Sequence, residues 1–279
     1  MTSQKTAFIT GITGNQGSAV ARHLLKNNYS VIGLTRNANS DKAQQLKADG
    51  ITLVEGDLNH PDSYQDKFNK VDSIFLVQAL QGKQNEIKQG KTFIDQMSPD
   101  KKTHLVYASV LGADLNTGVP HFESKYELEN YIKSKGLNHT ILRPASFYEN
   151  HLMPQVANGI KKGKYVTPLK RDCNQQMISV DHIGKIAAKV IRNENTYQGK
   201  TLDLATDEWQ IKDIPTAFAE VLKRPVKYGK LPGIITRLAM GKDLYKMFAY
   251  MNKNNFSVVE NINEVREEFG IKDDFRTWI

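Results

Sequence analysis

The sequence predicts an α/β protein built on a doubly wound parallel sheet, with a smaller, mostly helical lobe toward its C-terminal end. Three observations indicate this class. Short apolar runs alternate with amphipathic segments through the first half, a glycine-rich turn follows the first apolar run, and helical periodicity dominates after Pro144. Strict alternation of strands and helices favours a parallel sheet with right-handed crossovers.

The elements of the first half follow one another along the chain. Residues 7–10 form the first expected strand, and residues 15–27 carry apolar side chains at helical spacing. The later runs repeat this alternation. Further strands are expected at 31–34, 51–54, 73–77, 105–108 and 140–142, and further helices at 41–48, 61–69, 84–97 and 121–135.

The second half has a looser pattern. Helices are expected at 181–192, 211–223, 233–251 and 261–269. We therefore expect a dinucleotide-binding domain over 1–150 and a smaller lobe over 151–279 that packs on the sheet edge and shares its core. The expected helix 233–251 has apolar positions that fit either a core or a partner-docking face, and a core is the simpler interpretation. These positions are Ile234, Leu238, Leu244, Met247, Phe248 and Met251.

Composition limits the functional classes. The 279 residues are 39% hydrophobic and 24% charged, which is typical of a globular protein. The net charge of +8 comes from scattered Lys and Arg without zinc-finger spacing, so an ordinary basic surface is favoured over a nucleic-acid-binding face. No apolar run is long enough to cross a bilayer. With Cys173 as the single cysteine and no secretory signal, we expect a cytoplasmic protein that has no membrane partner.

Three glycines follow the first expected strand at intervals of three: Gly11, Gly14 and Gly17. A helix N-terminus attracts phosphate, provided that no side chain stands in the way. Gly11 permits a tight turn, Gly14 lets a pyrophosphate approach the backbone, and Gly17 lets the helix pack on the sheet. The spacing is G-x-x-G-x-x-G rather than the dehydrogenase pattern G-x-G-x-x-G, but the position between a strand and an amphipathic helix favours a Rossmann-type dinucleotide site.

The end of the second expected strand selects the dinucleotide. NAD sites place an acidic residue there to hold the ribose hydroxyls. Here the strand end reads Leu34-Thr35-Arg36-Asn37 and contains no acid, and the planar guanidinium of Arg36 suits a 2′-phosphate. We therefore expect NADP(H) rather than NAD(H). After the third strand, Asp57 fits either an adenine contact or a turn before Pro61.

Several segments together resemble the NmrA-like family of atypical short-chain dehydrogenases/reductases. They are GITGNQG, the strand-end Arg36, EGDL and HFESKYELENYIKSKGLNHTILRPASFYEN. QMISVDHIGKIAAKVI resembles the Asp-Ile-Gly helix start of the family. EIKQGKTFID and GKDLYKMFAYMN are similar to its NADPH-sensing members. The resemblance runs nearly end to end.

The resemblance implies a set of cofactor-binding residues. The glycine loop would hold the phosphates, Lys125 would be the active-site lysine, and Phe147 and Tyr148 would close over the nicotinamide. The full implied set is Gly11, Thr13, Gly14, Asn15, Gln16, Gly17, Arg36, Asp57, Leu58, Gln78, Ala79, Lys88, Lys125, Phe147 and Tyr148.

The superfamily's Tyr-x-x-x-Lys motif is altered here. His121 stands four residues before Lys125 in place of the tyrosine, while Ser109 matches the substrate-orienting serine. The tentative catalytic set is therefore Lys125, His121 and Ser109, although His121 also fits a plain first-turn residue. Asp181 and His182 suggest a helix N-cap rather than a metal pair.

Two functions remain open. The first is a redox sensor or regulator that responds to NADPH and NADP⁺ through a protein partner. The second is an NADPH-dependent reductase of quinone-like or other small electrophiles that uses Lys125 and takes its proton from Lys125, His121 or solvent. A homodimer is compatible with either function.

Overall fold

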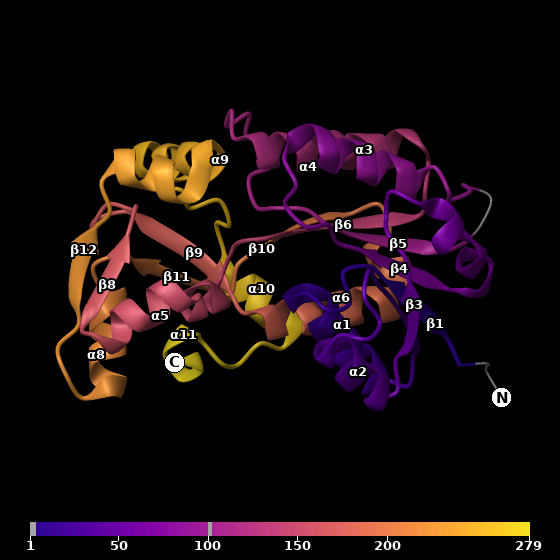
Figure 1. Ribbon diagram of the computed structural model, residues 1–279, viewed down its shortest axis with the longest axis horizontal. Helices are drawn as coiled ribbons and strands as arrows, with labels where there is room; N and C mark the ends of the chain where they lie inside the picture. The colour runs from indigo at the N-terminus through magenta and orange to yellow at the C-terminus, as the bar shows by residue number, and fades with distance from the viewer. Residues whose placement is uncertain (1–3, 100–101) are drawn as a thin grey trace. The chain divides into compact units, whose positions relative to one another are not determined.

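A computed structural model describes residues 4–99 and 102–279 (Figure 1). The chain folds into two compact units, each assembled from three segments. Unit 1 comprises the chain up to Val110, Glu123–Arg143 and Val180–Leu202, and unit 2 comprises Leu111–Phe122, Pro144–Ser179 and Asp203–Ile279. Within the described residues, no helix combines the length and the apolar content that a membrane span requires.

Unit 1 is organised by a seven-stranded sheet of order β10-β6-β5-β4-β1-β2-β3. The strands are β1 Thr6–Ile9, β2 Ser30–Thr35, β3 Thr52–Glu55, β4 Ser73–Leu76, β5 His104–Ala108, β6 His139–Pro144 and β10 Thr201–Leu204. The pairs from β3 across to β6 are all parallel. This order reverses beside β1, which is the arrangement of a Rossmann sheet, so the predicted fold class is confirmed.

Helices cover both faces of this sheet. On one face lie α1 Asn15–Leu25, α2 Asp41–Ala48 and α6 Val180–Arg192, and on the other lie α3 Lys83–Ile94 and α4 Pro120–Ser134 (Figure 1). The short helix α7 Glu194–Tyr197 follows α6 in the chain. Helix α6 belongs to unit 1 although it follows residue 150, because Gly184 lets it approach α1. A Cβ atom there would stand 2.7 Å from the carbonyl carbon of Ala19.

The core beneath α3 and α4 is aromatic. Phe8 from β1 packs against Phe68 with ring centroids 5.5 Å apart, and Phe93 from α3 lies 5.0 Å from Phe68 and 5.4 Å from Tyr64. Each of these four rings is at most 5% exposed. This cluster fixes α3 on the sheet and thereby fixes the polar groups that α3 carries.

Unit 2 contains two small sheets as well as helices. One sheet joins β7, β9 and β11, and β8 pairs with β12 in the other. The strands are β7 Ser146–Phe147, β8 Lys164–Thr167, β9 Asn174–Ile178, β11 Asp207–Gln210 and β12 Lys227–Lys230. The helices are η3 Tyr148–Leu152, α5 Pro154–Lys161, α8 Ile214–Leu222, α9 Gly233–Asn254, α10 Ile262–Phe269 and α11 Phe275–Trp278.

Two expected helices differ in the structure. The segment 61–69 forms two 3₁₀ turns, η1 Pro61–Ser63 and η2 Gln65–Lys70, in place of one α-helix. Tyr64 separates them with φ −147° and ψ −17°, because its ring is fully buried and its hydroxyl donates to the carbonyl of Leu58. Helix α9 is interrupted at Gly241, whose φ of +82° lies outside the helical region.

The interruption of α9 also changes the interpretation of its apolar side chains. Met251, in the second part, is buried as expected for a core position. Ile234 and Leu238, in the first part, are 73% and 82% exposed, so the core interpretation is wrong for this part of the helix. The apolar first part is an exposed surface of unit 2.

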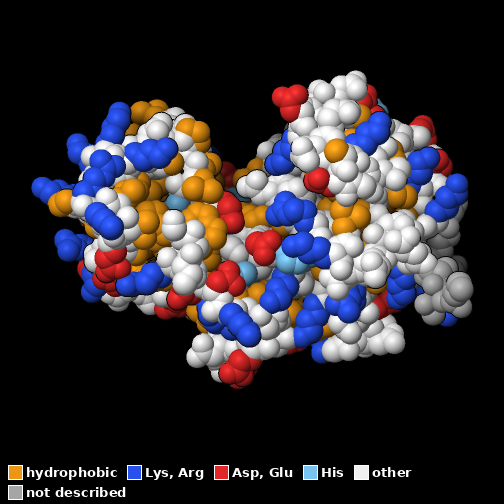
Figure 2. Space-filling view, turned by 90° about the horizontal axis from the view of Figure 1, so that it is seen from below, with side chains coloured by type: hydrophobic (Ala, Val, Ile, Leu, Met, Phe, Trp, Pro, Cys, Tyr) orange, Lys and Arg blue, Asp and Glu red, His pale blue; other side chains and the backbone are white. Residues whose placement is uncertain are grey.

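On the face of the molecule seen from below, the positive charge is distributed rather than concentrated (Figure 2). Figure 2 shows Lys and Arg side chains spread over the visible face among acidic, neutral and apolar ones. A nucleic-acid-binding face would gather these cations into a patch or stripe.

Two buried histidines predict that the protein loses stability in acid. Burial lowers the pKa of His104 and of His151 to about 4, from the usual value of 6.5. Both stay neutral in the folded chain, while the unfolded chain binds their protons below pH 6.5. The free energy of unfolding should therefore fall between about pH 6.5 and pH 4, by roughly 3 kcal/mol for each histidine.

Urea unfolding at pH 7 and pH 5 measures this loss. His151→Phe keeps the ring packing against Tyr165 and Phe218 but removes the titrating group. Its pH dependence should be shallower than that of the wild type. An equal slope in both proteins contradicts the role assigned to His151.

Candidate functional site

The glycine loop joins β1 to α1 in unit 1. Gly11 adopts φ +56°, which favours glycine, and its carbonyl oxygen accepts a hydrogen bond from the amide of Gly14 at 2.8 Å. A Cβ atom on Gly17 would stand 2.4 Å from the same oxygen. The turn and the close approach of α1 therefore both depend on the absence of side chains.

The start of α1 offers donors to an anion. Gly14 is the N-cap residue, no side chain of the described residues caps the helix, and its first turn holds no acidic residue. Such a terminus has unpaired N–H groups and partial positive charge. Oε1 of Gln16 is buried and has no hydrogen-bond partner in the described part of the chain. Thr13 is partly buried and Asn15 is exposed, so both lie at the surface of this loop.

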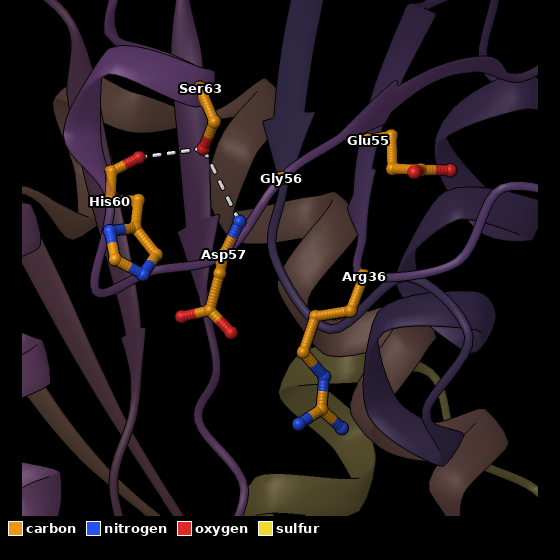
Figure 3. A pocket seen from close by; sticks show the side chains of 6 residues that line it. All are labelled: Arg36, Glu55, Gly56, Asp57, His60 and Ser63. Atoms are coloured by element: carbon orange, nitrogen blue, oxygen red, sulfur yellow. Dashed lines mark hydrogen bonds between the residues drawn. The ribbon is translucent and has the colours of Figure 1, made fainter.

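A depression of about 410 Å³ lies beyond β2 and β3. Its lining residues are Arg36, Glu55, Gly56, Asp57, His60 and Ser63 (Figure 3). The exposed Arg36 makes no hydrogen bond or ion pair with another described residue. The carboxylate of Glu55 points away from Arg36 and accepts from the amide of Ala38 at 2.9 Å. The guanidinium of Arg36 is thus available to an anionic group, because the carboxylate of Glu55 is already hydrogen-bonded to the loop backbone.

Asp57 forms the turn that was one of its two expected roles. Its Oδ1 accepts from the backbone amide of Asn59 at 2.8 Å and from the side-chain amide of Asn59 at 2.7 Å. The neighbouring Leu58 packs against the buried cluster, so its side chain has a structural role. An adenine contact by Asp57 stays a prediction.

Beyond β4, Gln78 is buried and Ala79 is exposed. Nε2 of Gln78 donates to the backbone carbonyl of Glu86 at 2.9 Å, while its Oε1 is buried and has no partner among the described residues. An acceptor of this kind can take a hydrogen bond from a ligand hydroxyl or amide. Lys88 lies on the exposed face of α3.

Lys125 pairs with Glu86, a residue that the sequence reasoning missed. Its Nζ lies 2.7 Å from Oε1 of Glu86, so the two groups form an ion pair. The lysine and glutamate side chains are 8% and 1% exposed. The hydroxyl of Ser124 donates to Oε2 of Glu86 at 2.7 Å. The spacing of Glu86 with Gly90 and Phe93 places it on the buried face of α3, and this periodicity could have revealed it.

Tyr107 lies beside this pair. Its ring centroid is 5.3 Å from Nζ of Lys125, a cation–π distance. Complete burial, and then the carboxylates of Glu86 and Glu129, raise the pKa of the Tyr107 phenol well above its usual value. Its hydroxyl has no hydrogen-bond partner in the described part of the chain, so it remains a neutral phenol within the core.

Ser109 belongs to a second buried network. Its hydroxyl donates to Oε1 of Glu129 at 2.5 Å. Arg143 donates to both oxygens of Glu129, from Nε at 2.9 Å and from Nη2 at 2.6 Å. The proton of Ser109 is therefore committed to Glu129, which the prediction of a substrate-orienting serine did not include.

His121 contacts a carboxylate in unit 2. Its Nδ1 lies 2.5 Å from Oδ1 of Asp243 in α9, another residue that was missed. The sequence offered little signal for this pair, because 122 positions separate the two residues. A histidine oriented by a carboxylate can hold or transfer a proton. The imidazole of His121 is therefore held by a carboxylate, and a role in proton transfer stays a prediction.

The segment 147–148 also lies in unit 2. Tyr148 is fully buried, and its ring packs 5.1 Å from Phe275 and 5.6 Å from Trp278. Burial raises the pKa of the Tyr148 phenol. The side chain of Tyr148 is therefore part of the unit 2 core, whereas Phe147 is partly exposed.

No group of three or more His, Cys, Asp or Glu side chains within 4–99 and 102–279 is arranged to hold a metal ion. Asp181 lies in the first turn of α6 and pairs with His23 of α1, with Oδ1 3.0 Å from Nε2. This contact lowers the pKa of the Asp181 carboxyl, and burial opposes the effect.

The sheet order and the bare glycine loop define a Rossmann-type protein with a dinucleotide-binding turn. The orphaned acceptors of Gln16 and Gln78 fit a ligand that crosses the strand ends. The chain belongs to the NmrA-like family, whose sequence model matches residues 3–274.

Three known proteins illustrate the similarity. An NmrA-like family domain-containing protein of Dictyostelium discoideum is 25% identical over 89% of this chain and 88% of its own length. The NADPH-dependent quinone oxidoreductase QOR2 of Escherichia coli, in complex with NADPH, superposes with a TM-score of 0.83 at 20% identity over 98% of each chain. NmrA, a negative transcriptional regulator in complex with NADP, gives 0.78 at 18% identity over 99% and 94%.

The glycine loop yields a prediction. Gly14→Val places a branched side chain over the start of α1, with its Cβ 3.0 Å from the carbonyl oxygen of Gly11. Binding of both NADPH and NADH should be lost in a chain that remains folded, as judged by titration calorimetry and circular dichroism. Gly233→Ala is the control, because its Cβ meets only the side chain of Tyr245 within 4 Å. Normal nucleotide affinity in Gly14→Val contradicts the loop assignment.

Proposed function

We propose that this protein binds NADP(H), in preference to NAD(H), and acts as a sensor or regulator that responds to the NADPH/NADP⁺ ratio. The observation that carries the proposal is the pairing of an uncapped, glycine-lined start of α1 with an uncommitted Arg36 beyond β2. The loop residues would hold the diphosphate, and Arg36 would hold the 2′-phosphate. When bound, the nicotinamide supplies hydride chemistry or reports its own oxidation state.

The catalytic groups of an ordinary carbonyl reductase are absent or engaged, which supports a regulatory role. His121 replaces the tyrosine, and the proton of Ser109 is committed to Glu129. Lys125 is held by Glu86. A regulator needs only two conformations that bind the two nucleotide forms unequally. The similarity to NmrA, described as a negative transcriptional regulator, is consistent with this role.

The second candidate is an NADPH-dependent reductase of quinone-like compounds. The contact between His121 and Asp243 favours it, since an oriented imidazole can deliver a proton. The similarity to a quinone oxidoreductase points the same way. A quinone acceptor also needs less help from an acid, because water readily protonates its reduced form.

The role of Arg36 is testable by substitution. Arg36→Ala should weaken NADPH binding by about 1.5–3 kcal/mol, the range of a charged hydrogen bond, and should leave NADH binding nearly unchanged. Titration calorimetry with both nucleotides measures the difference. Lys42→Ala in α2, a neighbouring exposed cation, is the control for loss of general positive charge. Equal losses for NADPH and NADH in Arg36→Ala show that Arg36 does not contact the 2′-phosphate.

Turnover separates the two candidate functions. A sensor should oxidise no NADPH beyond the background rate when it is offered quinones, azo dyes and aldehydes. The measurement is the absorbance of NADPH over time with the wild type, Lys125→Ala and His121→Phe. Acceptor-dependent oxidation that is lost in Lys125→Ala rules out a purely regulatory role. If His121→Phe also oxidises NADPH more slowly than the wild type, His121 is identified as the proton donor.

A further inference from the structure

The strand order gives the two halves of a dinucleotide different neighbours within unit 1. Strands β2 and β3, with Arg36, lie on one side of β1, and β4 and β5 lie on the other. In a doubly wound fold the ligand crosses the carboxyl ends of the strands at this switch point. With its phosphates at the glycine loop and its adenosine at Arg36, the nicotinamide half extends toward β4 and β5.

The pair formed by Glu86 and Lys125 lies beside those two strand ends. Gln78, directly after β4, donates to the backbone carbonyl of Glu86 at 2.9 Å. Tyr107, near the end of β5, has its ring centroid 5.3 Å from Nζ of Lys125. The Oε1 of Gln78 is a buried acceptor in this region that has no partner among the described residues. Two opposite charges are therefore fixed near the expected position of the nicotinamide.

Charges at this position act unequally on the two forms of the cofactor. The nicotinamide ring carries a positive charge in NADP⁺ and none in NADPH. Electrostatic interactions are stronger in a buried region than in water. The Lys125 side chain is 8% exposed and that of Glu86 is 1% exposed, so the lysine is the more accessible partner of the pair. The positive charge should dominate at the ring and disfavour NADP⁺.

We propose that the Glu86–Lys125 pair sets the relative affinity of the site for NADP⁺ and NADPH. This inference rests on the proposed binding of NADP(H) and assigns the redox discrimination to two residues. Lys125 shifts the preference toward NADPH, and Glu86 limits the size of that shift by neutralising most of the charge. The effect acts through the electric field and needs no proton transfer.

The measured quantity is the ratio of the dissociation constant of NADP⁺ to that of NADPH at one fixed pH. Glu86→Gln leaves the ammonium uncompensated and should raise the ratio, whereas Lys125→Met leaves the carboxylate and should lower it. Each shift should be on the order of fivefold or more, the usual size of coupling between sites. Binding of 2′,5′-ADP, which lacks the nicotinamide, should be unchanged in both variants.

The matched control is Glu127→Gln. Glu127 pairs with Lys91 at 2.7 Å across the same two helices, but its side chain is 43% exposed. The ratio should stay at the wild-type value, because solvent screens this charge. A shift as large as that of Glu86→Gln means that overall charge, not the buried pair, sets the ratio, and overturns the proposal.

Removal of one partner from a buried ion pair can destabilise a fold. The double variant E86Q/K125M carries no charge at either position and provides the second measurement. Its ratio should lie below that of the wild type and above that of Lys125→Met. A double variant that binds 2′,5′-ADP normally and keeps the wild-type ratio overturns the proposal, as do single variants that shift the ratio in the same direction. A wild-type protein that binds neither nucleotide nor 2′,5′-ADP refutes the proposed function itself.

Discussion

The close approach of α1 to the carbonyl of Gly11 is the constraint on which the rest of unit 1 depends. A Cβ atom on Gly17 would stand 2.4 Å from that oxygen, so only glycine lets α1 begin so close to the end of β1. The same helix is approached from its other side by α6, where Gly184 meets Ala19. The absence of side chains at Gly17 and Gly184 thus determines how α1 and α6 pack on the sheet and where the N-terminus of α1 points.

On the opposite face, α4 is held to the sheet and to α3 by buried charges. Glu129 pairs with Arg143 of β6, and Lys125 pairs with Glu86 of α3. Both pairs are almost completely covered, and hydroxyl groups satisfy further carboxylate oxygens. Buried ion pairs add little net stability but require one geometry, because separating the partners leaves a buried charge unpaired. The polar network therefore specifies the position of α4 more than it strengthens the fold.

The sequence predicted the sheet and the loop well, because both depend on local patterns. Apolar runs and glycine spacing mark β1, α1 and the turn between them without reference to the rest of the chain. The contact of His121 with Asp243 joins residues 122 positions apart, so no local sequence pattern could predict it. Tyr64 is the intermediate case, since its burial breaks the segment 61–69 into two turns although the sequence there reads as helical.

The break at Gly241 divides α9 into two parts with different attachments. Beyond the break, Met251 anchors the helix in unit 2, whereas before it Thr236 is the one side chain of 233–240 that is buried. A segment with so few tertiary contacts opens at a lower free energy than the domain that carries it. Residues 233–240 should thus behave as a separate cooperative unit, whose backbone amides exchange with solvent long before those of the sheet.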